Sequence, residues 1–259
     1  MTISHVEYGS GSPVIILHGL FGSARNWASI AKRLAKHHHV YAVNLRNHGT
    51  SFWDDAMRYE DMAEDLHRFI CRRDLRGADL VGHSMGGKAA MALALIHPNL
   101  VAKLVVVDIA PVEYEPHFSS YLKAMRALPL DQIRRRSDAD DRLAVTITDR
   151  RVRAFLLQNL EITAGASSWR INLAAIDDAM EDIRGFPDFV GHRRFVGPTL
   201  FVAGSTSDYL QPSHNAVIHG LFPKATFDVI QGAGHWVHAE RPDVFLSVIN
   251  NFLTPRSAS

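Results

Sequence analysis

The chain has 259 residues, 47% of them hydrophobic, which is enough for one α/β domain with an insertion. Its 28 lysines and arginines nearly balance its 27 aspartates and glutamates, so the net charge of +1 argues against a nucleic-acid or anionic-membrane partner. The single cysteine, Cys71, excludes an internal disulfide, and no uninterrupted apolar stretch reaches membrane-spanning length. Without a leader-like pattern at residues 1–13, the sequence predicts a cytoplasmic protein.

Short apolar segments alternate with helix-like segments along most of the chain. Apolar residues recur at helical spacing in residues 27–34, 62–70 and 242–253. Continuous runs of Val, Ile and Leu are typical of strands that are covered on both faces. The alternation therefore predicts a mostly parallel sheet flanked by helices. We expect its strands at residues 2–8, 14–17, 40–45, 79–82, 104–107, 199–203 and 226–230.

The alternation stops after Val107 and resumes at Thr199. The residues between them show helical periodicity, around Leu122 and Leu156, but no clear strand. We interpret residues 112–195 as a helical insertion. The core then consists of residues 1–111 and 196–259.

The stretch DLVGHSMGGKAAMALAL, residues 79–95, places Ser84 between an apolar strand and an Ala-rich helix. A serine hydroxyl becomes a useful nucleophile when a sharp strand-to-helix turn exposes it to a base. Gly82 and Gly86 suit such a turn, because a side chain at either position would collide where strand and helix pass closely. The alternative is a glycine-rich turn with an idle serine. The strand before the motif and the helix after it favour a nucleophile.

A tetrahedral oxyanion needs two convergent N–H donors. The residue after the serine, Met85, supplies one of them in this kind of turn. The loop in IILHGLFGS, after an early strand, offers Leu20 as the second donor and Phe21 as the alternative. Taken alone, this loop is equally well explained as a plain strand-to-helix turn.

A base and an acid must come from later in the chain. His235, in GAGHWVHAERP, lies between the last expected strand and the last helix, and the order serine, acid, histidine is typical of α/β-hydrolases. His235 and His238 have helical spacing that suits a metal, but no carboxylate-rich companion motif is present, so we predict no metal site. Two acids are candidates: Asp108 follows the strand after the serine helix, and Asp208 follows the penultimate strand. Topology does not choose between them, because both lie at the carboxyl edge of the sheet.

Five segments, in this order and spacing, resemble the α/β-hydrolase superfamily: HGLFGS, LRNHGTS, VGHSMGGKAAMALA, VVVDIAPVEY and GAGHWVHAERPDVF. The combination of RNHG, SMGGK and DIAPV is similar to the small bacterial carboxylesterase branch that includes mitochondrial α/β hydrolase domain-containing protein eleven. The resemblance spans nearly the whole chain. It implies an α/β-hydrolase fold with a helical cap, hydrolysis of small acyl esters or thioesters, and Asp108 as the acid.

Two positions depart from the pattern of that branch. Asn44 stands where a related strand end usually carries Asp, which bears on support of the loop at residues 46–51. The loop GSTSDYL carries Asp208, whereas the branch commonly lacks an acid there. The second departure keeps Asp208 open as the alternative acid.

We therefore predict a serine carboxylesterase with Ser84, His235 and Asp108 as catalytic residues, no cofactor, and a small acyl ester as partner. We expect Phe21, Met85, Phe155, Leu156 and Trp169 to line the substrate pocket. A ligand receptor with slow turnover keeps the same serine and histidine and stays an alternative. A carbon–carbon bond hydrolase and a perhydrolase share the triad, whereas a haloalkane dehalogenase needs a carboxylate in place of Ser84. The sequence leaves the oligomeric state open.

Overall fold

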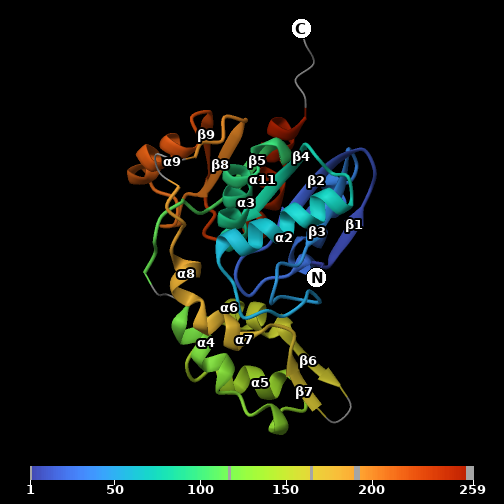
Figure 1. Cartoon of the computed structure of the whole chain (residues 1–259). Helices are drawn as coiled ribbons and strands as arrows, with labels where there is room; N and C mark the ends of the chain where they lie inside the picture. The colour runs from blue at the N-terminus through green and yellow to red at the C-terminus, as the bar shows by residue number, and fades with distance from the viewer. Residues whose placement is uncertain (1, 116–117, 164–165, 190–192, 255–259) are drawn as a thin grey trace.

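A twisted seven-stranded sheet forms the centre of the computed structural model, which describes residues 2–115, 118–163, 166–189 and 193–254 (Figure 1). Its spatial strand order is β1-β3-β2-β4-β5-β8-β9. All seven expected strands are present, although β1 is shorter than predicted. They are β1 (His5–Tyr8), β2 (Ser12–Leu17), β3 (His38–Val43), β4 (Ala78–His83), β5 (Val101–Val107), β8 (Thr199–Gly204) and β9 (Ala225–Ile230).

The mostly parallel sheet predicted from the apolar runs is confirmed. Only β1 runs antiparallel, pairing with β3, and the other neighbouring strands of this sheet are parallel. Leu17 of β2 pairs with Gly82 of β4, and Gly82 pairs with Val106 of β5. This register brings the loops that follow β2, β4 and β5 to one edge of the sheet, where ligands bind in open α/β sheets.

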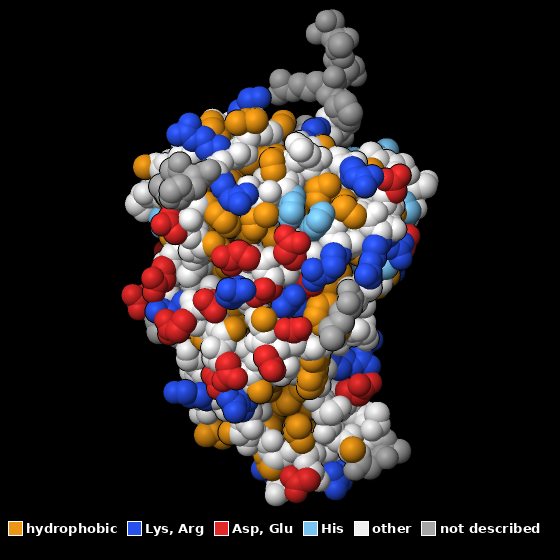
Figure 2. Space-filling model, in the orientation of Figure 1, with side chains coloured by type: hydrophobic (Ala, Val, Ile, Leu, Met, Phe, Trp, Pro, Cys, Tyr) orange, Lys and Arg blue, Asp and Glu red, His pale blue; other side chains and the backbone are white. Residues whose placement is uncertain are grey.

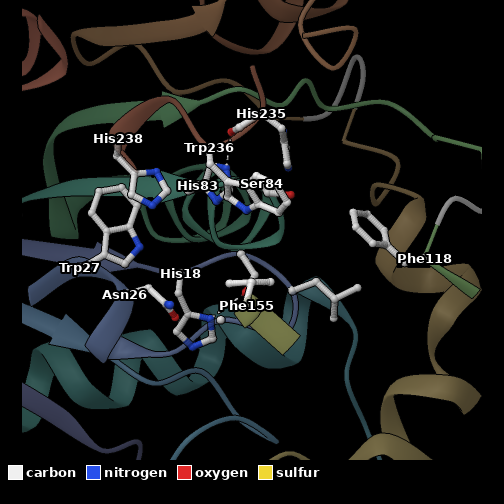
Figure 3. A pocket seen from close by; sticks show the side chains of 13 residues that line it. His18, Asn26, Trp27, His83, Ser84, Phe118, Phe155, His235, Trp236 and His238 are labelled. Atoms are coloured by element: carbon white, nitrogen blue, oxygen red, sulfur yellow. Dashed lines mark hydrogen bonds between the residues drawn. The ribbon is translucent and has the colours of Figure 1, made fainter. Parts of the chain in front are cut away.

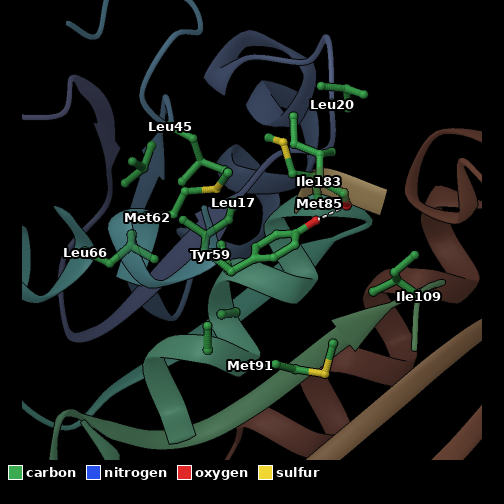
Figure 4. Close-up of a cluster of buried hydrophobic side chains, with 14 of the residues drawn as sticks. Leu17, Leu20, Leu45, Tyr59, Met62, Leu66, Met85, Met91, Ile109 and Ile183 are labelled. Atoms are coloured by element: carbon green, nitrogen blue, oxygen red, sulfur yellow. Dashed lines mark hydrogen bonds between the residues drawn. The ribbon is translucent and has the colours of Figure 1, made fainter. Parts of the chain in front are cut away.

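Helices cover both faces of the sheet. Alternate residues of β2 point to opposite faces, so Val14 packs with α1 and α11, whereas Ile15 belongs to the cluster that contains α2 and α3 (Figure 4). Each fully buried large aliphatic side chain contributes about 1.5–3 kcal/mol through removal of apolar surface from water. The helices outside the insertion are α1 (Ala28–Leu34), α2 (Tyr59–Arg72), α3 (Met85–Ile96), α9 (Asn215–Leu221), α10 (Val237–Glu240) and α11 (Pro242–Leu253).

A second layer, formed by the chain between β5 and β8, lies below the sheet in Figure 1. The prediction of helices without a strand was wrong here, because Leu160–Thr163 (β6) and Ala166–Trp169 (β7) pair as an antiparallel hairpin. Each of these strands has four residues and little apolar alternation, so the sequence gives no strand signal. The helices of this layer are α4 (Ser119–Arg126), α5 (Arg136–Leu143), α6 (Arg150–Leu156), α7 (Leu173–Asp178) and α8 (Met180–Arg184).

Acidic and basic side chains are interspersed on the face seen in Figure 2 and form no large area of one sign. This mixture agrees with the near balance of charges in the sequence. Among the described helices, none is long and apolar enough to cross a membrane.

Candidate active site

Ser84 occupies the tight turn between β4 and α3. Its backbone has φ 53° and ψ −122°, a strained combination for a residue with a side chain. A Cβ added to Gly82 would lie 2.3 Å from the carbonyl oxygen of Gly86, and one added to Gly86 would lie 2.5 Å from that of His18. The two glycines therefore permit the close crossing of strand and helix that the sequence predicted. Ser84 lies immediately before the first residue of α3, where unpaired backbone N–H groups favour negative charge.

His235 and Asp108 form a hydrogen-bonded pair beside this turn. The imidazole Nδ1 lies 2.8 Å from Oδ2 of Asp108, which is fully buried directly after β5. The backbone N–H of Gly204 donates to the other carboxylate oxygen at 3.0 Å, and the Ser207 hydroxyl donates to Oδ2. Asp208 is exposed and makes no hydrogen bond to His235 among the described contacts. The tertiary structure thus brings Asp108, rather than Asp208, to the histidine.

Two neighbours that the sequence analysis missed hold His235 in place. The ring of Tyr209 stacks on the imidazole with a centroid separation of 4.0 Å. His83, the residue before the serine, donates from Nε2 to the carbonyl oxygen of His235 at 2.8 Å. Burial lowers the pKa of His83 well below its ordinary value, so its ring is neutral. Both residues adjoin candidate residues in the sequence, but only the fold reveals their contacts.

Two adjacent backbone N–H groups in the loop after β2, those of Leu20 and Phe21, differ in their partners. Phe21 donates its backbone N–H to Nε2 of buried His48 at 3.3 Å, whereas the N–H groups of Leu20 and Met85 have no acceptor among the described residues. Burial lowers the pKa of His48 to about 4, and its Nδ1 donates to the carbonyl of Arg46 at 2.9 Å. The neutral ring therefore accepts at Nε2. This contact engages the N–H of Phe21, the alternative oxyanion donor.

Two cavities adjoin Ser84. Leu20, Ser84 and Phe118 line both of them, which makes the serine the junction between the two spaces. Figure 3 shows the first cavity, which is lined by His18, Gly19, Leu20, Gly22, Asn26, Trp27, His83, Ser84, Phe118, Phe155, His235, Trp236 and His238. The second is lined by Leu20, Tyr59, Ser84, Met85, Lys88, Ile109, Tyr114, Glu115, Phe118, Met180, Ile183, Arg184 and Tyr209.

The predicted pocket residues divide between these cavities and the packed interior. Phe155 lines the first cavity and Met85 the second. Phe21, Leu156 and Trp169 line neither. Phe21 and Leu156 are each 1% exposed and belong to the hydrophobic core, and Trp169 packs against that core. Apolar periodicity identifies buried positions but does not distinguish a cavity wall from solid packing.

Asn44, the first departure from the branch pattern, supports the loop after β2 at a distance from Ser84. Its Oδ1 accepts the backbone N–H of Ala24 at 2.8 Å, and its Nδ2 donates to the hydroxyl of Ser4 at 2.9 Å. An ionised aspartate would keep the first contact but has no proton to donate in the second. Asn44 is thus adapted to both partners.

His238 takes part in packing rather than in a group of metal-ligating side chains. It is buried, stacks on Trp27 with a centroid separation of 4.0 Å, and has its pKa lowered to about 3 by burial. One Glu–His–His group occurs among the described residues, where Glu64, His67 and His97 bring ligand atoms within 4.8 Å of one another. Glu64 accepts from His97 at 2.7 Å and from His67 at 3.3 Å, and these hydrogen bonds account for the arrangement. His97 follows the far end of α3 from Ser84.

Comparison with known proteins shows the family to which the chain belongs. Residues 12–242 match the alpha/beta hydrolase fold family. The chain is 42% identical over 255 residues to the zebrafish (Danio rerio) sn-1-specific diacylglycerol lipase ABHD11, covering 95% of this chain and 80% of that protein. It is 35% identical over 248 residues to Escherichia coli K12 esterase YbfF, covering 94% of each.

A solved structure of a marine microorganism esterase superimposes on the chain with a TM-score of 0.94 at 37% identity. The superposition covers 97% of this chain and 99% of that one. The matched range 12–242 includes Ser84, Asp108 and His235. The chain belongs to the α/β-hydrolase family, in the branch of ABHD11 and YbfF.

Proposed function

We propose that the chain is a carboxylesterase that cleaves small acyl esters or thioesters through an acyl-enzyme on Ser84. One observation carries the proposal: His235, which is hydrogen-bonded to Asp108, lines the same cavity as a serine on a strained strand-to-helix turn. Similarity to proteins named as esterases and lipases supports ester hydrolysis.

The proposed reaction begins when Ser84 Oγ attacks the acyl carbonyl carbon. His235 takes the hydroxyl proton at Nε2, because its Nδ1–H is engaged by Asp108. The tetrahedral intermediate collapses as the same proton passes to the leaving alcohol or thiol, and the acyl group remains on Ser84. Water, activated by His235, then attacks the acyl-enzyme and releases the carboxylic acid.

The N–H groups of Leu20 and Met85 are the proposed oxyanion donors. Neither has an acceptor among the described residues, and both residues line the second cavity with Ser84. A preorganised donor of this kind contributes about 10²–10³ in kcat. Residues 112–195 act as the cap in this proposal: Phe118 and Phe155 close the first cavity from that segment and limit the access of water.

Hydrolysis of p-nitrophenyl acetate tests the proposal. Ser84→Ala should lower kcat by at least ~10³, whereas Ser168→Ala, an exposed serine on β7, should retain wild-type turnover. A fluorophosphonate should label Ser84 stoichiometrically in the wild-type protein. Equal hydrolysis rates for wild type and Ser84→Ala would overturn the proposal.

The number of turnovers distinguishes an esterase from a receptor. An esterase should process many equivalents of ester and of the matching thioester without a partner protein. A single slow turnover that leaves a persistent adduct on Ser84 would contradict the esterase proposal and favour the receptor.

A further inference from the structure

Lys88 is a buried lysine one helical turn beyond the serine, and burial lowers its pKa to about 7. Lys88 is 1% exposed, and its backbone N–H donates to the carbonyl of Ser84 at 3.1 Å. The three ammonium donors reach three backbone carbonyls: Val112 at 2.8 Å, Arg184 at 2.8 Å and Gly185 at 2.6 Å. A buried ammonium needs such partners, because an unpaired one is strongly destabilising.

These carbonyls lie at the start of the insertion and at the end of its last helix, α8. Val112 lies where the chain leaves β5, and Arg184 and Gly185 lie at the C-terminal end of α8. Carbonyls at a helix C-terminus lack partners within the helix, and the ammonium of Lys88 supplies a donor to those of Arg184 and Gly185. We call the segments 112–114 and 183–185 the root joint.

The root joint is also held together internally. Tyr114 donates its backbone N–H to Arg184 at 3.0 Å, and Nη1 of Arg184 donates to the Tyr114 carbonyl at 3.2 Å. From α2, the hydroxyl of Tyr59 donates to the carbonyl of Ile183 at 2.6 Å, as Figure 4 shows. Lys88 lies 4.8 Å from the ring centroid of Tyr114. The ammonium of Lys88 therefore connects both segments of the root joint to α3, the helix that follows Ser84.

Residues of the root joint form part of the second cavity. Tyr114, Ile183 and Arg184 of the root joint line it, together with Lys88 of α3 and Tyr59 of α2. If the proposed esterase reaction holds, the second cavity accommodates the acyl group of the ester. His235 must protonate the leaving oxygen and lines only the first of the two cavities, so the leaving group occupies the first and the acyl group the second.

We propose that Lys88 is a positioning residue that sets the acyl size by fixing the root joint against α3. The joint determines how far the side chains of Tyr114 and Ile183 stand from Ser84. Its influence extends to the base, because the Tyr114 hydroxyl accepts from Ala110 N–H at 2.8 Å and donates to the carbonyl of Tyr209 at 2.5 Å. Tyr209 in turn stacks on His235.

A series of p-nitrophenyl esters from acetate to octanoate tests the role of Lys88. Lys88→Met keeps the length of the side chain but removes its three donors, so the root joint should loosen and admit longer acyl groups. We expect the ratio of kcat/KM for octanoate to that for acetate to rise about tenfold, the scale on which an apolar pocket discriminates a methylene group. Tyr59→Phe, which removes one tie to Ile183, should shift the ratio in the same direction by a smaller factor.

Lys103→Met is the matched control. Lys103 also binds carbonyls at a helix end, donating to Phe252 at 2.9 Å and Leu253 at 2.6 Å, but it adjoins neither cavity. Its loss should lower the melting temperature and leave the ratio unchanged. An unchanged ratio in folded Lys88→Met would overturn the proposal, as would an equal change in Lys103→Met.

If Lys88→Met does not fold, Tyr59→Phe provides the test. An unchanged ratio of kcat/KM values in Tyr59→Phe would then contradict the proposal. Loss of all hydrolysis in Ser84→Ala tests the proposed function separately. If Ser84→Ala keeps wild-type activity, the esterase proposal fails whatever Lys88→Met does. If Ser84→Ala is inactive and the ratio stays constant, only the role of Lys88 is refuted.

Discussion

The backbone N–H of Phe21 donates to Nε2 of His48 across 3.3 Å of the interior. Phe21 has φ 61°, a left-handed conformation that is unfavourable for a bulky residue. Its carbonyl accepts from Nδ2 of Asn159 at 2.7 Å, so both sides of the residue are held. This anchoring fixes the residue that follows Leu20, the proposed oxyanion donor.

Removal of the acceptor on His48 should impair chemistry more than binding. In His48→Leu the Phe21 N–H loses its partner and the loop loses its fixed conformation, so we expect kcat to fall about 10–100-fold with little change in KM. His48→Gln, which offers a carbonyl acceptor, should recover part of the loss. Exposed His37→Leu serves as control. Wild-type kcat in His48→Leu would show that this contact does not position the loop.

Asp108 and Asp208 should respond very differently to substitution by asparagine. Asp108→Asn removes the charge that stabilises the imidazolium and disturbs the tautomer of His235, so kcat should fall by up to ~10⁴. Asp208 is exposed, and Asp208→Asn should change kcat by less than about threefold. Steady-state kinetics on a nitrophenyl ester measures both. The reverse order would identify Asp208 as the acid, and comparable partial losses would indicate a shared role that the double variant tests by non-additivity.

Relief of backbone strain at the serine should be visible in stability. Ser84→Gly removes the Cβ that makes φ 53° unfavourable, so this inactive variant should be about 1 kcal/mol more stable than Ser84→Ala. Urea unfolding of the two variants measures the difference. At Ser168, on an exposed strand, glycine should instead be less stable than alanine. Equal stabilities of Ser84→Gly and Ser84→Ala would contradict a strained turn.

Buried neutral histidines should make the fold sensitive to acid. Burial lowers the pKa from the ordinary value of 6.5 to about 3 in His18 and His238 and to about 4 in His48. Below pH 6.5 the unfolded chain binds protons that the folded chain excludes. The stability from these residues is therefore fully present above pH 6.5 and is lost as pH falls toward 4 and 3.

Each such histidine should lower the free energy of unfolding by about 1.4 kcal/mol per pH unit within this window. Urea titrations at pH 7.5, 6 and 5 measure the slope. His48→Gln should reduce this slope by the contribution of one histidine, whereas exposed His37→Gln should leave the slope unchanged. A free energy of unfolding that does not vary between pH 7 and 5 would contradict burial of these rings in neutral form.

The sequence alone was sufficient for the sheet and for the tight strand-to-helix turn at Ser84. The inner strands β2, β4 and β5 contain runs of β-branched and aliphatic residues, and the turn around Ser84 follows from the local steric needs of Gly82 and Gly86. Such features depend on residues adjacent in the chain, so they can be inferred without knowledge of the fold. The short hairpin of β6 and β7 lacks such a local pattern of apolar residues, so it could not be inferred from the sequence.

Only the tertiary structure decided which residues from distant segments meet. Asp108 and Asp208 both follow strands at one edge of the sheet, and the choice between them depends on the path of the loops and on burial. In the sequence, Lys88 is one residue of an apolar helix. In the fold, its ammonium binds the carbonyls of Val112 and Arg184, which lie 24 and 96 positions away in the chain. Periodicity specifies which face of an element is buried, whereas contacts across such separations depend on how whole elements pack.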